Sequence, residues 1–545
     1  MLNLEQLDLI RVIKPKEDIL SYVNEKMILI TSAAYVNSEF QAEFGRLPPS
    51  FLPIGNRRLF EYQLEFLRKT LSNHKVFITL PDNFLISIKD TMYFDKCDVK
   101  ILRSDEDISL GEAIAQALDL SAISGEALYL LHGDTLVEEV PASTNVIGIA
   151  KTDKDYKWKV EAEESTFEAV WCGFFSFESV DTFKRLLDQS NNHFIDAVRS
   201  YATEYKVKNV WIDGWHDFGH VNTYFLSRSK FTTQRSFNAL TIVDGCVKKT
   251  GNPSEKIKAE STWFANVPAK LKRFCPQLID VGTDALGQAF YISEYLPLPP
   301  LNEVFVHGKN PIFYWDKIFF LCSNFLEICH QFDGAIDANT LGDKDLAGSK
   351  TWQRLEAFCN QSNYPGIDIP NVINGKKIHS LRTIVHACVT NVGNCEPILG
   401  ILHGDFCFSN ILFDSRMDNI KVVDPRGLSE LGLPTSHGDL RYDLAKLTHS
   451  VIGLYDFIMA GAFDLEFTLS EEQCSFDLLI HADERVKSIQ DVYMSHTFFA
   501  NTSPKSAIPL TVLLFLSMLP LHSDDKYRQM ALLANAMRLY SDFVD

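Results

Sequence analysis

The stretch that most limits what this chain can fold into runs from Ile401 to Gly427 and reads ILHGDFCFSNILFDSRMDNIKVVDPRG. A loop carries His403 and Asp405, a short apolar run begins after Asn410, and a second β-like run ends at Asp424. A loop followed by a hairpin brings such side chains close together. Phosphoryl transfer from ATP needs a set of this kind, because one carboxylate accepts or orients the proton of the attacking hydroxyl while an amide and a second carboxylate hold Mg²⁺.

This spacing leads to four assignments. Asp405 is predicted to be the base, Asn410 and Asp424 are predicted to bind the metal, and His403 is predicted to brace the loop. The alternative is a plain β-hairpin with incidental polar residues. The D-x-x-x-x-N spacing and the Asp that closes the following strand favour the catalytic interpretation.

A lysine and a glutamate that could hold the nucleotide lie upstream. Two β-like runs, Leu240 to Val243 and Cys246 to Lys249, are joined by Asp-Gly, which is a strong hairpin signal. Lys249 ends the second run and is predicted to pair with Glu260 on the next helix, as kinases do to hold the α- and β-phosphates. Lys248 is the rival, because alternation along a strand turns just one of the two lysines to the cleft. Two solvated lysines on an edge strand remain the third interpretation.

The run Tyr291 to Leu296 is predicted to be a hinge between two lobes, whose backbone at Glu294 and Leu296 would meet adenine. Three prolines follow within the next four residues, so the run is equally a domain crossing. Helical periodicity beyond it, at Trp315 to Phe332, Lys350 to Cys359 and His379 to Val392, predicts a helical lobe under the catalytic loop.

These motifs resemble the aminoglycoside phosphotransferase and choline/ethanolamine kinase superfamily. They are most similar to kinase-like proteins of bacterial capsule and surface-polysaccharide clusters, which share Asp424-Pro-Arg-Gly and the run from Gly438 to Leu447. The resemblance covers residues 237–545 and implies an α+β kinase-like domain that uses ATP and Mg²⁺ to phosphorylate an alcohol, sugar or sugar-like acid. It also implies that Asp443 anchors the catalytic loop. Arg426 could contact phosphate or pair with Asp439.

Strand and helix patterns alternate in the first 230 residues. Met27 to Thr31, Lys75 to Leu80 and Leu128 to Leu131 read as buried strands, with helical patterns between them. Such alternation predicts an α/β domain with a mostly parallel sheet. The third strand delivers Asp134, and ligands of such sheets bind at the carboxyl ends of strands.

The order of these pieces resembles the sugar-phosphate nucleotidyltransferases, over about residues 26 to 230. The resemblance implies an α/β fold of the Rossmann-like, GT-A type, in which Asp134 and Asp217 hold Mg²⁺ on the triphosphate of CTP or another nucleoside triphosphate. The family's Gly-rich first loop is absent here, and Pro49 stands where a lysine is usual. Arg46, with Arg57 and Arg58, could replace the missing charge, and Glu39 and Glu43 would oppose it. A domain that binds nucleotide or substrate without catalysis is the alternative.

Composition limits the partners. A net charge of −19 argues against nucleic acid, whose binding surfaces are basic. The charged first residues do not resemble a signal peptide, and the apolar run from Ile508 to Leu521 is expected to fall short of a membrane span. The 11 Cys are scattered singly, which favours a reducing cytoplasm. We predict a cytoplasmic enzyme with small-molecule and nucleotide partners, divided into domains 1–232 and 233–545, each with its own core. Homo-oligomerisation stays open.

Overall fold

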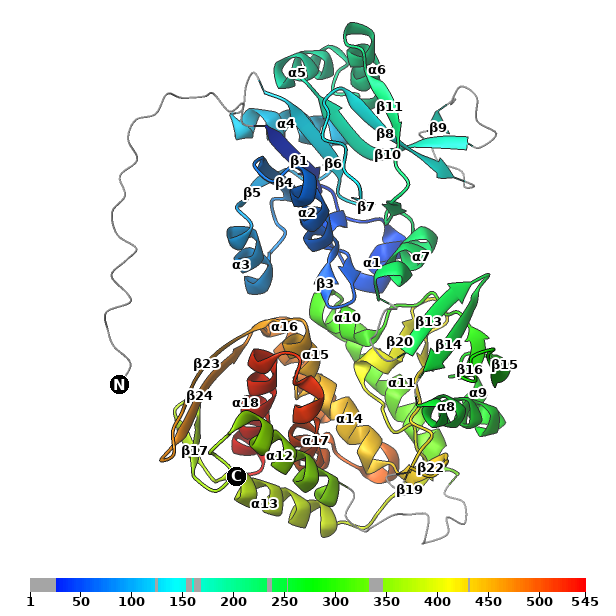
Figure 1. Cartoon of the computed structure of the whole chain (residues 1–545), viewed down its shortest axis with the longest axis vertical. Coiled ribbons are helices and arrows are strands. Elements are labelled where there is room, and N and C mark those ends of the chain that lie inside the picture. The colour runs from blue at the N-terminus through cyan, green and yellow to red at the C-terminus, as the bar shows by residue number, and fades with distance from the viewer. Residues whose placement is uncertain are drawn as a thin grey trace.

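The computed structural model describes most of the 545-residue chain. The described residues are 26–122, 126–152, 159–160, 168–232, 238–251, 253–332, 347–429 and 432–545. In Figure 1 the chain forms an upper N-terminal half and a lower C-terminal half, which meet near β3 and α10. The predicted boundary at residues 232/233 lies at the end of helix α7 (Val221–Thr232). Residues 233–237 lie outside the described part, and the boundary stays a prediction.

The N-terminal half is built on a twisted sheet in the order β11-β8-β10-β6-β1-β4-β5, with β9 paired to β10. Pairs β1–β4, β1–β6, β4–β5 and β8–β11 are parallel, whereas β10 pairs antiparallel with β6, β8 and β9. The strands are β1 (Met27–Thr31), β4 (Lys75–Pro81), β5 (Val99–Ser104), β6 (Leu128–His132), β8 (Val146–Thr152), β9 (Lys159–Val160), β10 (Glu168–Phe177) and β11 (Lys208–Trp211). The three strands predicted from the sequence are present.

Both faces of this sheet are buried. Met27 and Leu29 of β1 belong to one hydrophobic cluster, while Ile28 and Ile30 belong to another. Alternate residues of a strand point to opposite faces, so a continuous apolar run is what a sheet covered on both sides requires. The helices of this half are α1 (Ser38–Phe44), α2 (Leu59–Thr70), α3 (Ile88–Lys96), α4 (Leu110–Ser121), α5 (Val180–Gln189), α6 (Phe194–Glu204) and α7.

The C-terminal half begins with a small lobe. Its antiparallel sheet has the order β13-β14-β16-β15, and α8 packs against β14, β15 and β16. The elements are β13 (Asn238–Val243), β14 (Cys246–Gly251), α8 (Ser254–Asn266), α9 (Ala269–Lys272), β15 (Leu278–Thr283) and β16 (Ala289–Glu294).

A larger helical lobe follows, and helices occur in the three stretches where periodicity predicted them. Its helices are α10 (Leu301–His307), α11 (Ile312–His330), α12 (Gly348–Ser362), α13 (Leu381–Gly393), α14 (Arg441–Val451), α15 (Tyr455–Met459), α16 (Glu484–Ser495), α17 (Ile508–Met518) and α18 (Lys526–Phe543). The strands are β17 (Asn371–Ile373), β18 (Lys376–Ile378), β19 (Leu399–Ile401), β20 (Ile411–Asp414), β21 (Asn419–Val422), β22 (His437–Asp439), β23 (Phe463–Leu469) and β24 (Cys474–Ile480).

The apolar helix around α17 corrects one expectation. Within the described residues, Pro504–His522 is long and apolar enough, with a mean hydropathy of 1.5, to cross a membrane by length and composition. The expectation that this run is too short is therefore wrong. However, 61% of its most apolar window is buried inside the protein, where α17 packs against α12, α13, α14 and α18.

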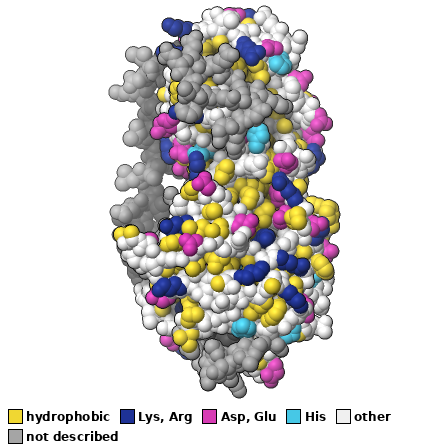
Figure 2. All heavy atoms as spheres, turned by 90° about the vertical axis from the view of Figure 1, so that its right-hand side faces the viewer, with side chains coloured by type: hydrophobic (Ala, Val, Ile, Leu, Met, Phe, Trp, Pro, Cys, Tyr) yellow, Lys and Arg dark blue, Asp and Glu magenta, His cyan; other side chains and the backbone are white. Residues whose placement is uncertain are grey.

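The two halves share an extensive interface, which corrects the expectation of separate cores. One hydrophobic cluster contains Phe44 and Tyr224 from the first half together with Leu301 and Trp315 from the second. On the side of the molecule that lies to the right in Figure 1, exposed hydrophobic side chains gather around its middle (Figure 2). Polar contacts add to the interface: the Lys309 backbone N–H donates to the Phe44 carbonyl at 2.7 Å.

A buried ion pair also crosses this interface. Arg228 of α7 donates through Nε to Glu303 of α10 at 2.9 Å, and the second oxygen of Glu303 accepts the Gly55 backbone N–H at 3.0 Å. Glu303 is 1% exposed. Although burial lowers the pKa of Arg228, the carboxylate of Glu303 raises it above the usual range. Arg58, buried in an ion pair with Asp90, donates to the His307 carbonyl at 2.9 Å.

Candidate functional site

One carboxylate anchors the loop of the C-terminal half that carries His403 and Asp405. Asp443, near the start of α14, accepts the backbone N–H groups of His403 and Gly404 at 2.7 and 2.8 Å. This is the anchoring contact that the resemblance implies. The His403 ring packs edge-on against Trp263 at 5.7 Å between centroids, and burial lowers the pKa of His403 to about 4. His403 is therefore a neutral ring inside the lobe, which suits a brace.

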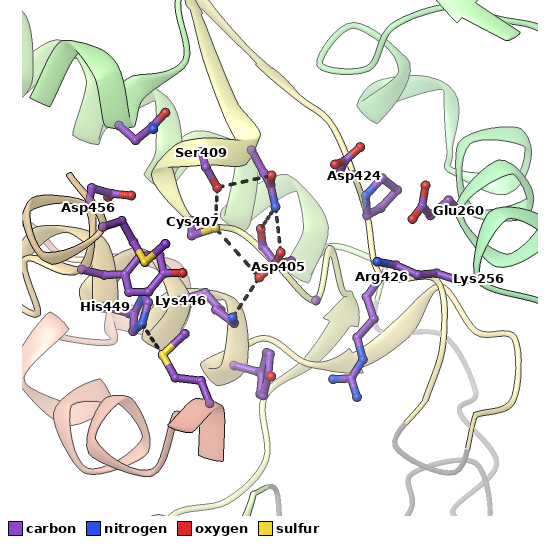
Figure 3. A pocket seen from close by; sticks show the side chains of 18 of the residues that line it. Lys256, Glu260, Asp405, Cys407, Ser409, Asp424, Arg426, Lys446, His449 and Asp456 are labelled. Atoms are coloured by element: carbon purple, nitrogen blue, oxygen red, sulfur yellow. Dashed lines mark hydrogen bonds and ion pairs between the residues drawn. The ribbon is translucent and has the colours of Figure 1, made fainter. Parts of the chain in front are cut away.

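Asp405 faces a cation that the sequence analysis did not single out. Its Oδ1 lies 2.9 Å from Nζ of Lys446 on α14, and Oδ2 accepts an N–H of Asn410 at 2.8 Å (Figure 3). Although burial raises the pKa of Asp405, the Lys446 ammonium outweighs burial and holds it at about 2. The carboxylate is therefore ionised at neutral pH and is a weak base. It is better suited to orient a hydroxyl group than to remove its proton early.

Asn410 and Asp424 supply oxygen atoms that fit Mg²⁺. The Asn410 amide nitrogen is engaged with the main-chain and side-chain oxygens of Asp405, at 2.9 and 2.8 Å, which leaves its amide oxygen as a ligand. Asp424 has a left-handed backbone with φ of +56°, a conformation that Asp adopts more readily than most residues. Among the described residues, no group of three or more His, Cys, Asp or Glu side chains could hold a metal, so phosphate and water oxygens would complete the shell.

Lys249 and Glu260 form the ion pair predicted from the sequence, and Lys249 is the strand lysine that faces the cleft. Lys249 Nζ lies 2.7 Å from Glu260 Oε2 and 2.9 Å from Asp424 Oδ1, and the lysine is 3% exposed. Although burial lowers the pKa of Lys249, the carboxylates of Asp424 and Glu260 raise it. Lys248 points the other way: it is exposed, its ammonium lies 4.4 Å from the centroid of the Phe290 ring, and it lines neither cavity of the site. The structure thus removes Lys248 from the candidate nucleotide site.

Two adjoining cavities surround these residues. The first, of about 540 Å³, lies beside Lys249 and the predicted hinge, where Glu294 and Leu296 both line it. The Tyr295 backbone N–H donates to the Gly245 carbonyl and ties the hinge to the β13–β14 turn. The apolar side chains Leu240, Val247 and Leu412 give this cavity the walls that a nucleobase requires. We name it the nucleotide cavity.

The second cavity, of about 590 Å³, is lined by Asp405, Asn410 and Lys446, and we name it the acceptor cavity. Its far end holds Asp456, a buried carboxyl whose Oδ2 has no hydrogen-bond partner among the described residues. Burial raises the pKa of Asp456 to about 7. Lys256 and Arg426 bring positive charge to the opposite side (Figure 3).

The structure distinguishes between the two contacts predicted for Arg426, one with a phosphate and one with Asp439. Asp439, one of them, is held by Arg441, whose Nη2 lies 2.6 Å away. Arg426 lies over the Tyr442 ring, 5.7 Å from its centroid, and lines the acceptor cavity. The structure therefore places Arg426 where it could meet a phosphate or an acidic acceptor, and pairing with Asp439 is wrong.

A second cluster of carboxylates lies in the N-terminal half. Strand β7 (Thr135–Val137) pairs with β12 (Trp215–Asp217), which brings Asp134 and Asp217 together at the carboxyl end of β6. A Cβ atom on Gly219 would lie 2.6 Å from Asp134 and 3.3 Å from Asp217, so a residue without a side chain is needed between them. Burial, followed by the Asp217 charge, raises the pKa of Asp134 to about 6. Two neighbouring carboxylates fit a divalent cation whose remaining ligands are phosphate and water oxygens.

The charged residues expected to lie around a triphosphate in the N-terminal half make other contacts. Glu43 is buried at the interface, where Oε1 accepts the Ser415 hydroxyl at 2.8 Å, so it does not oppose a polyphosphate. Arg46 is half-exposed, pairs with Glu106 at 3.0 Å and stacks on Tyr35 at 4.1 Å. Arg57 pairs with Glu65 at 3.1 Å. These arginines are engaged in contacts within the N-terminal half.

Several residues of the site were not identified from the sequence. Lys446 lies in the run from Gly438 to Leu447, but its pairing with Asp405 joins segments 41 positions apart. Asp456 sits in no motif. Asn56, in the N-terminal half, lines both cavities of the C-terminal half. The roles assigned to Asp405, His403, Asn410, Asp424, Lys249, Glu260, Glu294, Leu296, Asp134, Asp217 and Arg46 stay predictions.

No protein-family model matches the sequence, and no curated protein matches it. Among solved structures, a nucleoside-diphosphate-sugar pyrophosphorylase from Vibrio cholerae is 13% identical with a TM-score of 0.31, and the match covers 38% of this chain and 100% of that one. An inositol-1-phosphate CTP transferase from T. maritima is 11% identical with a TM-score of 0.28, covering 38% and 96%. The GDP complex of an aminoglycoside 2'-phosphotransferase is 12% identical with a TM-score of 0.33, covering 57% and 91%.

Proposed function

We propose that the C-terminal half is an ATP-dependent phosphotransferase that acts on an alcohol group of a small molecule, a sugar or a sugar-like acid. One observation carries this proposal: the Lys249–Glu260 ion pair meets Asp424 at the junction between the nucleotide cavity and the cavity that holds Asp405 and Asn410. This is the arrangement by which kinases place a phosphate chain beside an acceptor hydroxyl.

Each residue then has a chemical task. Lys249 binds the phosphate oxygens, and Asn410 and Asp424 hold Mg²⁺, which when bound neutralises phosphate charge. Asp405 accepts a hydrogen bond from the acceptor hydroxyl and so directs the hydroxyl oxygen toward the γ-phosphorus. As the new P–O bond forms and the bond to the β–γ bridging oxygen breaks, the hydroxyl proton passes to Asp405. Lys446 compensates the charge of Asp405 before this transfer and keeps the loop closed around it.

The acceptor cavity supports a polar acceptor. Asp456 offers a carboxyl group for hydroxyl hydrogen bonds at one end, and Lys256 and Arg426 offer cations at another. The ring centroids of Tyr455 and His449 lie 4.4 Å apart, and both rings line this cavity with an apolar surface. Hydroxyls, an anionic group and a C–H face are features of a sugar or sugar-like acid.

Replacing Lys249 by alanine tests the nucleotide site, and Lys248→Ala is its matched control. We expect Lys249→Ala to weaken the binding of Mg²⁺-ATP at least tenfold, because a charge-assisted contact to phosphate is lost and Glu260 is left unpaired in a buried site. Lys248→Ala should stay within about twofold of wild type. Isothermal titration calorimetry gives both affinities. Equal effects of the two substitutions would refute the assignment of the nucleotide cavity.

We propose a second activity, nucleotidyl transfer from CTP or another nucleoside triphosphate, for the N-terminal half. The close pair Asp134 and Asp217 favours it, since two carboxylates can hold Mg²⁺ on a triphosphate as pyrophosphate leaves. The first half would then use the product of the second. The alternative is a module that binds nucleotide or substrate without catalysis.

Pyrophosphate release separates these alternatives. With each nucleoside triphosphate and a panel of phosphorylated sugars and alcohols, the wild-type chain should release pyrophosphate. Asp134→Asn and Asp217→Asn should each lower the rate at least a hundredfold, whereas Asp188→Asn, on an exposed helix position, should not. If wild type binds a nucleoside triphosphate in this half but releases no pyrophosphate, the half is a binding module.

The sequence motifs support a proposal for the cellular role. We propose that the enzyme acts in the cytoplasm and prepares an activated sugar or sugar-like unit for capsule or surface-polysaccharide synthesis. The motifs Asp424 to Gly427 and Gly438 to Leu447 support this role through their resemblance to kinase-like proteins of capsule clusters.

A further inference from the structure

A hairpin of the N-terminal half reaches the kinase site of the C-terminal half. Strands β2 (Pro53–Ile54) and β3 (Arg57–Arg58) pair antiparallel around the two-residue turn Gly55–Asn56. Gly55 has φ of +66°, which a turn of this kind requires at its first central position. The turn therefore fixes Asn56 at the tip of the hairpin, where its side chain is exposed.

Asn56 lines both cavities of the kinase site. The nucleotide cavity and the acceptor cavity share four residues: Asn56, Asn302, Ser409 and Asp424. Three of them belong to the C-terminal half, and one of these three, Asp424, is a predicted metal ligand. The junction of the cavities is where the terminal phosphates of a bound nucleotide must lie, because the phosphoryl group crosses there from nucleotide to acceptor. Asn56 lies at this junction.

In the described part of the chain, the β13–β14 turn of the small lobe does not cover this junction. Protein kinases cover the phosphates with a Gly-rich loop of the small lobe. Here the β13–β14 turn, Asp244–Gly245, lines neither cavity, and in the described part of the chain no strand pairs with the outer edge of β13. Residues of the N-terminal half line the nucleotide cavity alongside β13 instead, among them Arg57, Tyr62 and Phe231.

The hairpin is fixed in this position. The Gly55 N–H donates to Glu303, the same carboxylate that binds Arg228, and Glu303 directly follows Asn302 on α10. Arg58, at the other end of the turn, donates to the His307 carbonyl at the end of α10. Movement of the turn away from the cavities would break buried, charge-assisted hydrogen bonds.

From these contacts we infer that the Gly55–Asn56 turn covers the phosphates of the nucleotide bound in the kinase site, with the Asn56 amide donating a hydrogen bond to a phosphate oxygen. This inference rests on the proposed kinase function. The N-terminal half then completes the kinase site, whatever its own chemistry, and the ligand that Asn56 recognises is the polyphosphate rather than the base.

Affinities for Mg²⁺-ATP and for adenosine test this inference in the full-length chain. Asn56→Ala should weaken Mg²⁺-ATP binding about threefold to tenfold through the lost hydrogen bond. Asn56→Asp, which has the same shape, should weaken it at least tenfold, because a carboxylate then faces the phosphates. Adenosine, which has no phosphate, should bind both variants within twofold of wild type. Displacement of a fluorescent ATP analogue measures all of these affinities.

Two comparisons make the result decisive. Asn209→Asp adds the same charge on the exposed strand β11 and should leave both affinities within twofold of wild type. Lys249→Ala reports on the kinase site itself. If Lys249→Ala weakens Mg²⁺-ATP but Asn56→Asp does not, the inference is overturned while the kinase proposal stands. Equal losses for adenosine and Mg²⁺-ATP in Asn56→Asp also overturn it. If Lys249→Ala has no effect, the kinase proposal itself fails.

Discussion

Replacing Asp405 by alanine is expected to lower phosphorylation of the acceptor by about 10²–10⁴-fold, the usual contribution of a group that handles the reacting proton. The carboxylate is fixed by Lys446 at 2.9 Å and by Asn410 at 2.8 Å, so its loss removes the group that aims the acceptor hydroxyl. Asp405 does not line the nucleotide cavity, and Mg²⁺-ATP affinity should therefore stay within about twofold. Turnover is measured with an acceptor found by screening metabolites for ATP consumption.

Asp477→Ala is a suitable control, because Asp477 is exposed on β24. It should leave turnover unchanged. Full turnover in a folded Asp405→Ala protein would remove the phosphotransferase assignment. A parallel loss of Mg²⁺-ATP affinity and of turnover would instead show that Asp405 shapes the nucleotide site.

Replacing Glu303 by alanine is expected to destabilise the whole chain by about 3–5 kcal/mol, the usual cost of leaving one partner of a buried ion pair alone. Arg228 would keep its charge in the interface, and the Gly55 N–H would lose its acceptor. Chemical denaturation followed by circular dichroism measures the change. A cooperative transition that splits in two would show that the halves unfold separately once the pair is broken.

A double substitution isolates the ion pair. Arg228→Met combined with Glu303→Leu removes both charges and should restore much of the lost stability, since apolar residues often replace a buried pair at little cost. Glu466→Ala, at an exposed position of β23, controls for loss of a glutamate and should change stability by less than about 0.5 kcal/mol. A small effect of Glu303→Ala would mean that water replaces the carboxylate and that the interface is loosely packed.

Local patterns predicted the parts of the site that are close in sequence. Alternation along β14 separates Lys249 from Lys248, and a loop followed by a hairpin brings Asp405, Asn410 and Asp424 together. Strand runs buried on both faces predicted the N-terminal sheet. Each of these predictions needed just the period of one element or the length of one connection.

Contacts between distant segments could not be predicted in this way. Glu43 carries the charge of a surface residue, yet the interface between the halves buries it against Ser415, 372 positions away. Asn56 lies in a short turn with no motif. It lines the same cavities as Asp424 because its hairpin packs against α10 of the other half. The expectation of two separate cores failed for the same reason, because apolar residues on α1, α7 and α10 do not reveal which neighbour they cover.

Helix α7 connects two sites that the chain keeps apart. Thr223 and Ser227 on this helix hold Asp217 through its side chain and its carbonyl, and Arg228, the next residue, binds Glu303. Thr223 and Arg228 lie on the same helix and are separated by about 7.5 Å along its axis. If each half binds a nucleotide as proposed, a ligand that moves Asp217 would also move Arg228, which lines the nucleotide cavity. Because linkage is reciprocal, occupancy of either half would then alter the affinity of the other.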